Sequence, residues 1–163
     1  MQTMPKPPAT HTINQNEPLE VFGIELRTSN NEAMQTIPPH WQRFAEEAVL
    51  AHIPGKVSDE VYAVYTHFEH AGSSNEGQYS LIIGARVQAG TPLPDGLSRA
   101  VIPASQRAVF PVGTGRFDLV GATWQEIWAR TDLPKTFIAE YERYGAGGEI
   151  DIFIGIDKDA VPA

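Results

Sequence analysis

Residues 137–156, FIAEYERYGAGGEIDIFIGI, decide the fold, because they have the pattern of two strands joined by a glycine-rich turn. The glycine run from Gly145 to Gly148 supplies the positive backbone angles that a hairpin needs. Beyond the turn, isoleucine occupies every second position from Ile150 to Ile156, which is typical of a strand with one buried face. The stretch therefore predicts a β-hairpin that must pack on the rest of the chain.

The first strand of this hairpin carries a carboxylate within an aromatic and apolar segment. Alternation places Ile138, Glu140, Glu142 and Tyr144 on one face and Phe137, Ala139, Tyr141 and Arg143 on the other. We interpret Glu142 as the anionic floor of a pocket for a cationic or polarised small molecule. A solvated edge-strand glutamate, paired with Arg143 or a neighbouring lysine, is the alternative, and the residues alone favour neither interpretation.

The composition bounds the class of protein. A length of 163 residues suits one domain with one core. The net charge of −8 and the scattering of the 12 basic residues argue against direct nucleic-acid binding, and the acidity favours cationic partners only weakly. The chain has no cysteine, which excludes disulfides and thiol catalysis and fits the cytoplasm. No signal peptide and no apolar run of about 18 residues is present, so we expect no membrane association.

The rest of the chain has the pattern of strands and helices between two tails. The expected strands are 19–28, 61–69, 79–87 and 98–112, the last continuous or with a bulge near Pro103, and the expected helices are 38–52 and 117–130. Residues 1–18, with four prolines among polar residues, are expected to form a flexible tail, and residues 158–163 a second one. One domain is then expected over residues 19–157.

The order strand, helix, strand, strand occurs twice, which predicts an internal repeat. Phe68-Glu69 aligns with Tyr141-Glu142, and Ile83-Gly84 aligns with Ile154-Gly155. Two pseudo-symmetric halves of this kind predict an α+β fold, with an antiparallel sheet and both helices on one face. The ligand groove is expected at the seam between the halves.

Aromatic side chains are the expected wall of this groove. The predicted ligand-binding residues are Glu142, Trp41, Trp124, Phe44, Tyr65, Tyr79, Phe110 and Tyr144. Trp128, one turn beyond Trp124, is assigned to the core. Core packing is the alternative for every aromatic residue at helical spacing.

Other motifs do not predict a site, and we expect no metal and no cofactor. His67 and His70 have an odd spacing on a strand, so they point to opposite faces and cannot share an ion. Gly113-Thr114-Gly115 lacks the lysine of a phosphate-binding loop and the third glycine of a dinucleotide site. If the chain is an enzyme, Glu142, or Glu140 on the same face, is the expected general base.

Over residues 19–157 the chain resembles the GyrI-like small-molecule-binding domain, also called the AraC-type effector-binding domain. The motifs that carry the resemblance are Ser29-Asn30-Asn31, Trp41-Gln42-Arg43-Phe44, Tyr79 to Val87 with Gly84, Val101-Ile102-Pro103-Ala104, Thr123-Trp124 to Ile127-Trp128, and Tyr141 to Tyr144 with Glu149 to Gly155. The resemblance implies binding of lipophilic cations and drugs, with the glutamate at position 142 meeting the cation inside an aromatic pocket. Because 18 polar residues cannot hold a DNA-binding unit, the chain resembles the stand-alone members.

Three functions are consistent with this resemblance. The leading one is a non-catalytic module that acts as sensor, sink or effector-binding partner for hydrophobic, cationic small molecules. The second is a hydrolase of electrophilic toxins that uses a pocket glutamate as base and a tyrosine as proton donor. The third is a gyrase-inhibitor-like module whose partner is a protein such as gyrase or a regulator. A free sheet edge would also permit a homodimer.

Overall fold

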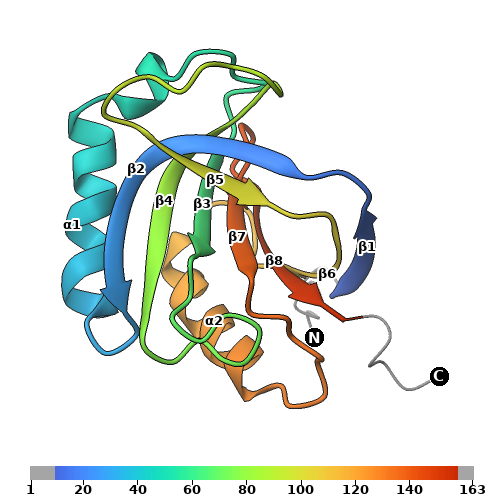
Figure 1. Ribbon diagram of the computed structural model, residues 1–163. Helices are drawn as coiled ribbons and strands as arrows, with labels where there is room; N and C mark the ends of the chain where they lie inside the picture. Colours follow the sequence, from blue (N-terminus) through green and yellow to red (C-terminus); the bar gives the residue numbers. More distant parts are fainter. Residues whose placement is uncertain (1–9, 158–163) are drawn as a thin grey trace, which may run out of the picture.

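The computed structural model describes residues 10–157, and in this range one antiparallel sheet carries two α-helices on one face (Figure 1). The strands are β1 (His11–Gln15), β2 (Leu19–Ser29), β3 (Val61–Thr66), β4 (Gln78–Val87), β5 (Ser98–Ile102), β6 (Ser105–Pro111), β7 (Ala139–Tyr144) and β8 (Ile150–Ile156). The helices are α1 (Ala33–Glu46) and α2 (Val120–Ala129), accompanied by the 3-10 turns η1 (Val49–His52) and η2 (Phe117–Leu119). The predicted α+β class is confirmed.

The sheet has a palindromic arrangement of two β-β-α-β-β units. The strand order is β1-β6-β8-β7-β3-β4-β2-β5, so β3 of the first unit meets β7 of the second unit at the centre. The first strand of each unit crosses to the other unit, because β1 pairs with β6 and β5 pairs with β2. Each unit therefore contributes an edge strand to its neighbour, and the two units are interlocked.

The sequence pattern places residues 11–15 in a tail, but the structure places them in β1, which pairs with β6 along its whole length. The strand is polar and mostly exposed, so it lacks the alternation that marks a half-buried strand. It is held by backbone pairing and by Gln15, whose amide donates to the carbonyls of Ile102 at 3.3 Å and Pro103 at 3.1 Å. Residues 1–9 and 158–163 of the expected tails lie outside the described residues.

The expected strand over 98–112 is two strands with different partners. β5 pairs with β2, whereas β6 pairs with β1 and β8. Pro103 and Ala104 separate them. Because proline has no N–H for the ladder, the chain leaves one end of the sheet here and joins the other end.

The first helix begins and ends earlier than expected, since α1 covers Ala33–Glu46. Its first turn is stabilised by Thr36, whose hydroxyl donates to the carbonyl of Glu32 at 3.0 Å and lies 2.6 Å from the hydroxyl of Thr28. Helical geometry therefore extends ahead of Pro38. The helix ends before Ala48, which has a positive φ of 50° and begins the separate turn η1.

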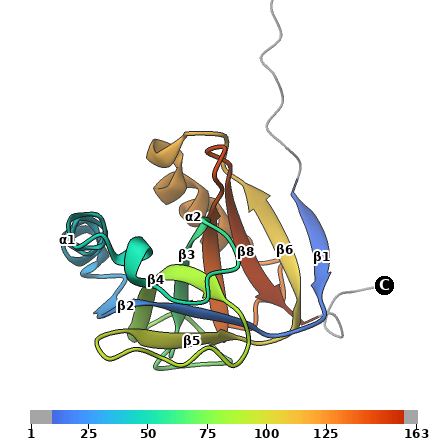
Figure 2. The ribbon, with the colours of Figure 1, turned by 90° about the horizontal axis from the view of Figure 1, so that it is seen from above.

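The core has one layer on each face of the sheet. Under α1, Phe44 packs with residues of β2, β3 and β4, and under α2, Ile127 packs with residues of β6 and β8. On the opposite face the sheet bends over itself, so that Val21 of β2 shares a cluster with Phe153 of β8 (Figure 2). Two paired glycines, Gly23 and Gly84, permit the close approach of β2 and β4, because a Cβ on either would overlap the other strand's backbone.

Candidate ligand-binding site

A cavity of about 850 Å³ lies between α1 and α2, over the seam of β3 and β7 where the sequence predicts a groove. Both units supply its walls, and aromatic side chains dominate them. The lining residues are Asn30, Ala33, Met34, Ile37, Pro38, Trp41, Tyr65, Phe68, Asn75, Tyr79, Phe117, Val120, Gly121, Trp124, Gln125, Trp128, Glu140, Glu142 and Tyr144. The volume lies in the range of sites that enclose drug-sized molecules.

Glu142 forms the floor of this cavity and is only 2% exposed. Its Oε2 accepts hydrogen bonds from Tyr65 Oη at 2.8 Å and Trp124 Nε1 at 2.7 Å, and its Oε1 accepts one from Tyr144 Oη at 2.5 Å. In the register of β3 and β7 it lies opposite Ala63, whose small side chain leaves room for the three donors. The interpretation as a solvated edge-strand residue is therefore wrong.

Burial determines the protonation of this cluster. It raises the pKa of Glu142, while the hydrogen bonds from Tyr144, Trp124 and Tyr65 lower it in part. Burial, together with the same carboxylate, raises the pKa of Tyr65 and Tyr144 far above the ordinary value and that of Tyr79 to about 12. The phenols are therefore protonated near neutral pH, so the two bonded to Glu142 act as donors.

Aromatic rings surround the carboxylate in edge-on pairs. Trp41 meets Tyr144, and Tyr65 meets Trp124, each with ring centroids 5.2 Å apart. Phe117 stacks on Tyr144 at 5.9 Å and is 66% exposed. The rings come from α1, α2, η2 and both central strands, so a flat apolar guest would contact both units at once.

Glu140 is the second carboxylate of the cavity, on the same face of β7 as Glu142. It lies opposite Tyr65 and is 4% exposed. Burial raises its pKa to about 7, against the opposing effect of Lys135 and Arg107. Two buried carboxylates in one cavity make its floor acidic.

Six of the eight predicted site residues line the cavity, and two do not. The six are Glu142, Trp41, Trp124, Tyr65, Tyr79 and Tyr144. Phe44 lies one turn beyond Trp41 and packs against the sheet under α1. Phe110 lies on β6 and is buried in the core with residues of α2 and β8. Both contribute to the core and are not on the cavity wall.

The sequence pattern misses several lining residues, chiefly at the start of α1. Met34 and Ile37 precede the expected helix start at Pro38. Met34, Ile37 and Trp41 nevertheless follow one another at spacings of three and four residues, which places all three on one helix face. Trp128, assigned to the core, is 38% exposed and lines the cavity beside Trp124. The spacing of Met34, Ile37 and Trp41 was the available signal for this wall.

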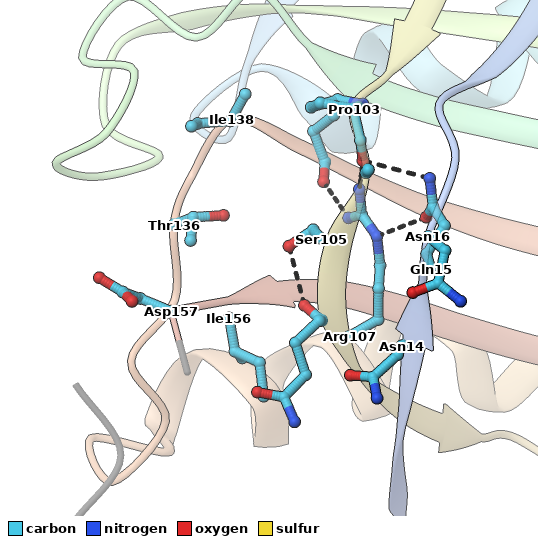
Figure 3. A pocket seen from close by; sticks show the side chains of 13 residues that line it. Asn14, Gln15, Asn16, Pro103, Ser105, Arg107, Thr136, Ile138, Ile156 and Asp157 are labelled. Atoms are coloured by element: carbon cyan, nitrogen blue, oxygen red, sulfur yellow. Dashed lines mark hydrogen bonds between the residues drawn. The ribbon is translucent and has the colours of Figure 1, made fainter. Parts of the chain in front are cut away.

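A second cavity, of about 610 Å³, lies where β1, the start of β6 and the end of β8 meet (Figure 3). Its buried cation is Arg107, which is 1% exposed. The guanidinium donates to Gln15 Oε1 at 2.8 Å, to the Ala139 carbonyl at 2.6 Å and to the Pro103 carbonyl at 2.9 Å. These bonds connect β1, β7 and the turn between β5 and β6, so Arg107 holds the exchanged strands together.

The residues discounted as metal ligands lie outside both cavities. His67 follows the end of β3 with a positive φ of 51°, and His70 lies 3.5 Å from Glu69 at the half-exposed start of a loop. Residues 10–157 contain no group of three or more His, Asp or Glu side chains that could hold a metal ion. Over the same range, no helix has the length and apolarity needed to cross a membrane.

The fold and the cavity define an effector-binding domain for small molecules, and comparison with known proteins names its family. The chain belongs to the integron-associated effector binding proteins, whose family pattern matches residues 12–156. The resemblance inferred from the sequence motifs is thereby confirmed. No curated protein matches the chain.

Solved structures share the fold at low sequence identity. An integron cassette protein from the mobile metagenome of Vibrio cholerae is 22% identical with a TM-score of 0.69, over 91% of this chain and 95% of that chain. SAV2435, solved with bound tetraphenylphosphonium, is 16% identical with a TM-score of 0.76, over 92% and 94%. A protein from Staphylococcus aureus MU50 is 17% identical with a TM-score of 0.69, over 91% and 97%.

Proposed function

We propose that this protein binds hydrophobic, aromatic small molecules that carry a positive charge, in the cavity between α1 and α2. The observation that carries the proposal is Glu142, a buried carboxylate on the floor of a cavity walled by aromatic rings. Ring faces and a desolvated anion both favour a cation over a neutral guest of the same shape. The binding of tetraphenylphosphonium by SAV2435, which shares the fold, supports the same ligand class. The role we propose is that of a non-catalytic sensor or sink.

Titration with tetraphenylphosphonium tests this proposal directly. Trp41, Trp124 and Trp128 line the cavity, so their fluorescence should change saturably as the cation enters. Glu142→Gln should weaken binding by about tenfold or more, because the amide keeps the size of the side chain and removes its charge. Glu149→Gln, in the exposed hairpin turn, removes one negative charge elsewhere and should leave the affinity unchanged.

A truncation of the aromatic wall separates ring contacts from charge. Trp41→Ala keeps both glutamates and should also weaken tetraphenylphosphonium binding by about tenfold. Equal affinity in Glu142→Gln and the unmutated protein would remove the charge argument. Equal affinity in Trp41→Ala would remove the argument from the aromatic wall.

A hydrolase is the second candidate, favoured by one observation. Glu140 lies in the cavity with its pKa raised to about 7, which suits a general base at neutral pH. Tyr65, opposite it, would then be the proton donor. Incubation with an electrophile that contains an aryl-substituted cyclopropane distinguishes the two functions. Repeated release of the ring-opened product would support catalysis, and stoichiometric binding without product would exclude it.

A further inference from the structure

The two carboxylates of the cavity differ in their hydrogen bonding. Glu142 accepts three hydrogen bonds from side chains, so about one of its four acceptor positions remains open. Among residues 10–157 no side-chain hydrogen bond and no ion pair within 4 Å reaches the carboxylate of Glu140, although the residue is only 4% exposed. A buried carboxylate that accepts no hydrogen bond destabilises the fold unless water or a ligand supplies a donor.

The oxygens of Glu140 are nevertheless in contact with open space. In the described part of the chain, Gln106 Oε1 is the one buried side-chain oxygen or nitrogen that is both sealed from solvent and without a hydrogen-bond partner. The unbonded oxygens of Glu140 are therefore not sealed. Glu140 lines the cavity between the helices and does not line the second cavity. Its free acceptor positions are thus available to a molecule in the candidate site.

The neighbouring cations, Lys135 and Arg107, donate hydrogen bonds to other acceptors. Lys135 Nζ donates to the Arg130 carbonyl at 2.6 Å, and Arg107 donates to three acceptors in the region of the second cavity. Tyr65, which lies opposite Glu140 on β3, donates its hydroxyl hydrogen to Glu142. Neither these two cations nor Tyr65 donates a hydrogen bond to Glu140, and a ligand could supply one.

We propose that Glu140 accepts a hydrogen bond from the ligand, and that the preferred ligands are aromatic amines whose protonated nitrogen carries an N–H. In this assignment, which rests on the proposed function, Glu142 orders the rings around the site and contributes charge. Glu140 discriminates an ammonium N–H from a cation that has no hydrogen to donate. A charge-assisted hydrogen bond in a dry site provides about tenfold discrimination.

Proton release gives this assignment a second signature. Burial raises the pKa of Glu140 to about 7, so near pH 6.5 a large part of the carboxyl is protonated in the empty site. A bound ammonium adds to the fields of Lys135 and Arg107, lowers this pKa and expels the proton. Glu142 lies two residues away and burial raises its pKa as well, but the three hydrogen bonds that it accepts favour its ionised form in the empty site. Release should therefore depend on Glu140.

Two probes that differ in one substituent on nitrogen, a hydrogen or a methyl group, test the proposal. N,N-dimethyl-2,2-diphenylethylamine, protonated below pH 8, and its trimethylammonium analogue carry the same rings and the same charge. Calorimetry at pH 6.5, in two buffers of different ionisation enthalpy, would measure affinity and released protons together. We expect the unmutated protein to prefer the amine by about tenfold and to release protons on binding it.

The variants identify the responsible carboxylate. Glu140→Gln should lose the preference for the amine and the proton release, while circular dichroism shows an unchanged fold. Glu142→Gln should bind both probes less tightly and retain the preference. An unmutated protein that binds the two probes equally, or a preference that persists in Glu140→Gln, would overturn the assignment. If neither probe nor tetraphenylphosphonium binds at all, the proposed function itself fails.

Discussion

Replacing Glu140 with glutamine should change how the stability of the empty protein depends on pH. The folded protein holds this carboxyl at a pKa of about 7, against an ordinary value of 4.5. Because the folded-state pKa is raised, the fold favours the protonated form. The contribution of Glu140 to stability is therefore largest below pH 4.5 and falls as the pH rises through 7. Glutamine is neutral throughout this range and removes this loss.

The size of the effect follows from the two pKa values. Each pH unit between them corresponds to about 1.4 kcal/mol, so the ionised Glu140 costs up to about 3 kcal/mol of unfolding free energy above pH 7. The amide also loses hydration when it is buried, although the cavity leaves it room for water. We therefore expect the unfolding free energy of Glu140→Gln to be about 1–3 kcal/mol higher than that of the unmutated protein at pH 8. Near pH 4.5 the two values should be equal.

Urea unfolding at pH 4.5, 6 and 8, followed by tryptophan fluorescence, measures this difference. The other buried carboxyl, Glu142, is present in both proteins, so its contribution cancels in the comparison. Glu149→Gln is the control for charge, since its carboxylate is exposed. A stability difference that does not change with pH, or a Glu140→Gln protein that is less stable at pH 8, would refute the reasoning.

Three further predictions concern the frame of the site, each measured as the unfolding free energy in urea. Gly84→Ala should lower the unfolding free energy by about 3 kcal/mol, because the new Cβ would overlap the backbone of β2. Gly121→Ala is the control in α2: its Cβ would meet open space, so the unfolding free energy should rise by up to about 1 kcal/mol. Arg107→Met should cost about 2–4 kcal/mol by removing three hydrogen bonds of a buried side chain, and faster amide exchange in β1 would localise the effect. Ala63→Leu should cost about 1–3 kcal/mol and also weaken tetraphenylphosphonium binding, because Ala63 lies opposite Glu142.

The fold was predictable where each strand carries its own pattern. The alternation from Ile150 to Ile156 predicted β8 because one face of that strand is buried. β1 carries no such pattern, since its side chains are exposed and its stability depends on the backbone of β6. The exchange of β1 and β5 between the units also escaped prediction. For β5 it depends on the turn at Pro103, whose direction local residues do not determine.

For the candidate site, the sequence predicted which residues share a face of β7, but it did not predict which side chains contact one another. Alternation placed Glu140, Glu142 and Tyr144 together, and the structure places them on one cavity wall. The donors to Glu142 are 77 residues away at Tyr65 and 18 residues away at Trp124. Their convergence depends on the register between β3 and β7 and on the packing of α2 against the sheet, which no single segment specifies.

The pseudo-symmetric frame carries an asymmetric site, and this asymmetry explains how a buried charge is tolerated at the seam. Across the central pair, Ala63 faces Glu142 and Tyr65 faces Glu140, so β7 supplies the acids and β3 supplies a small residue and a donor. If positions 63 and 65 also carried carboxylates, four like charges would share one low-dielectric space, and their mutual repulsion would destabilise the fold. Aromatic donors from β3, α2 and β7 instead stabilise Glu142 and leave Glu140 free to select a guest.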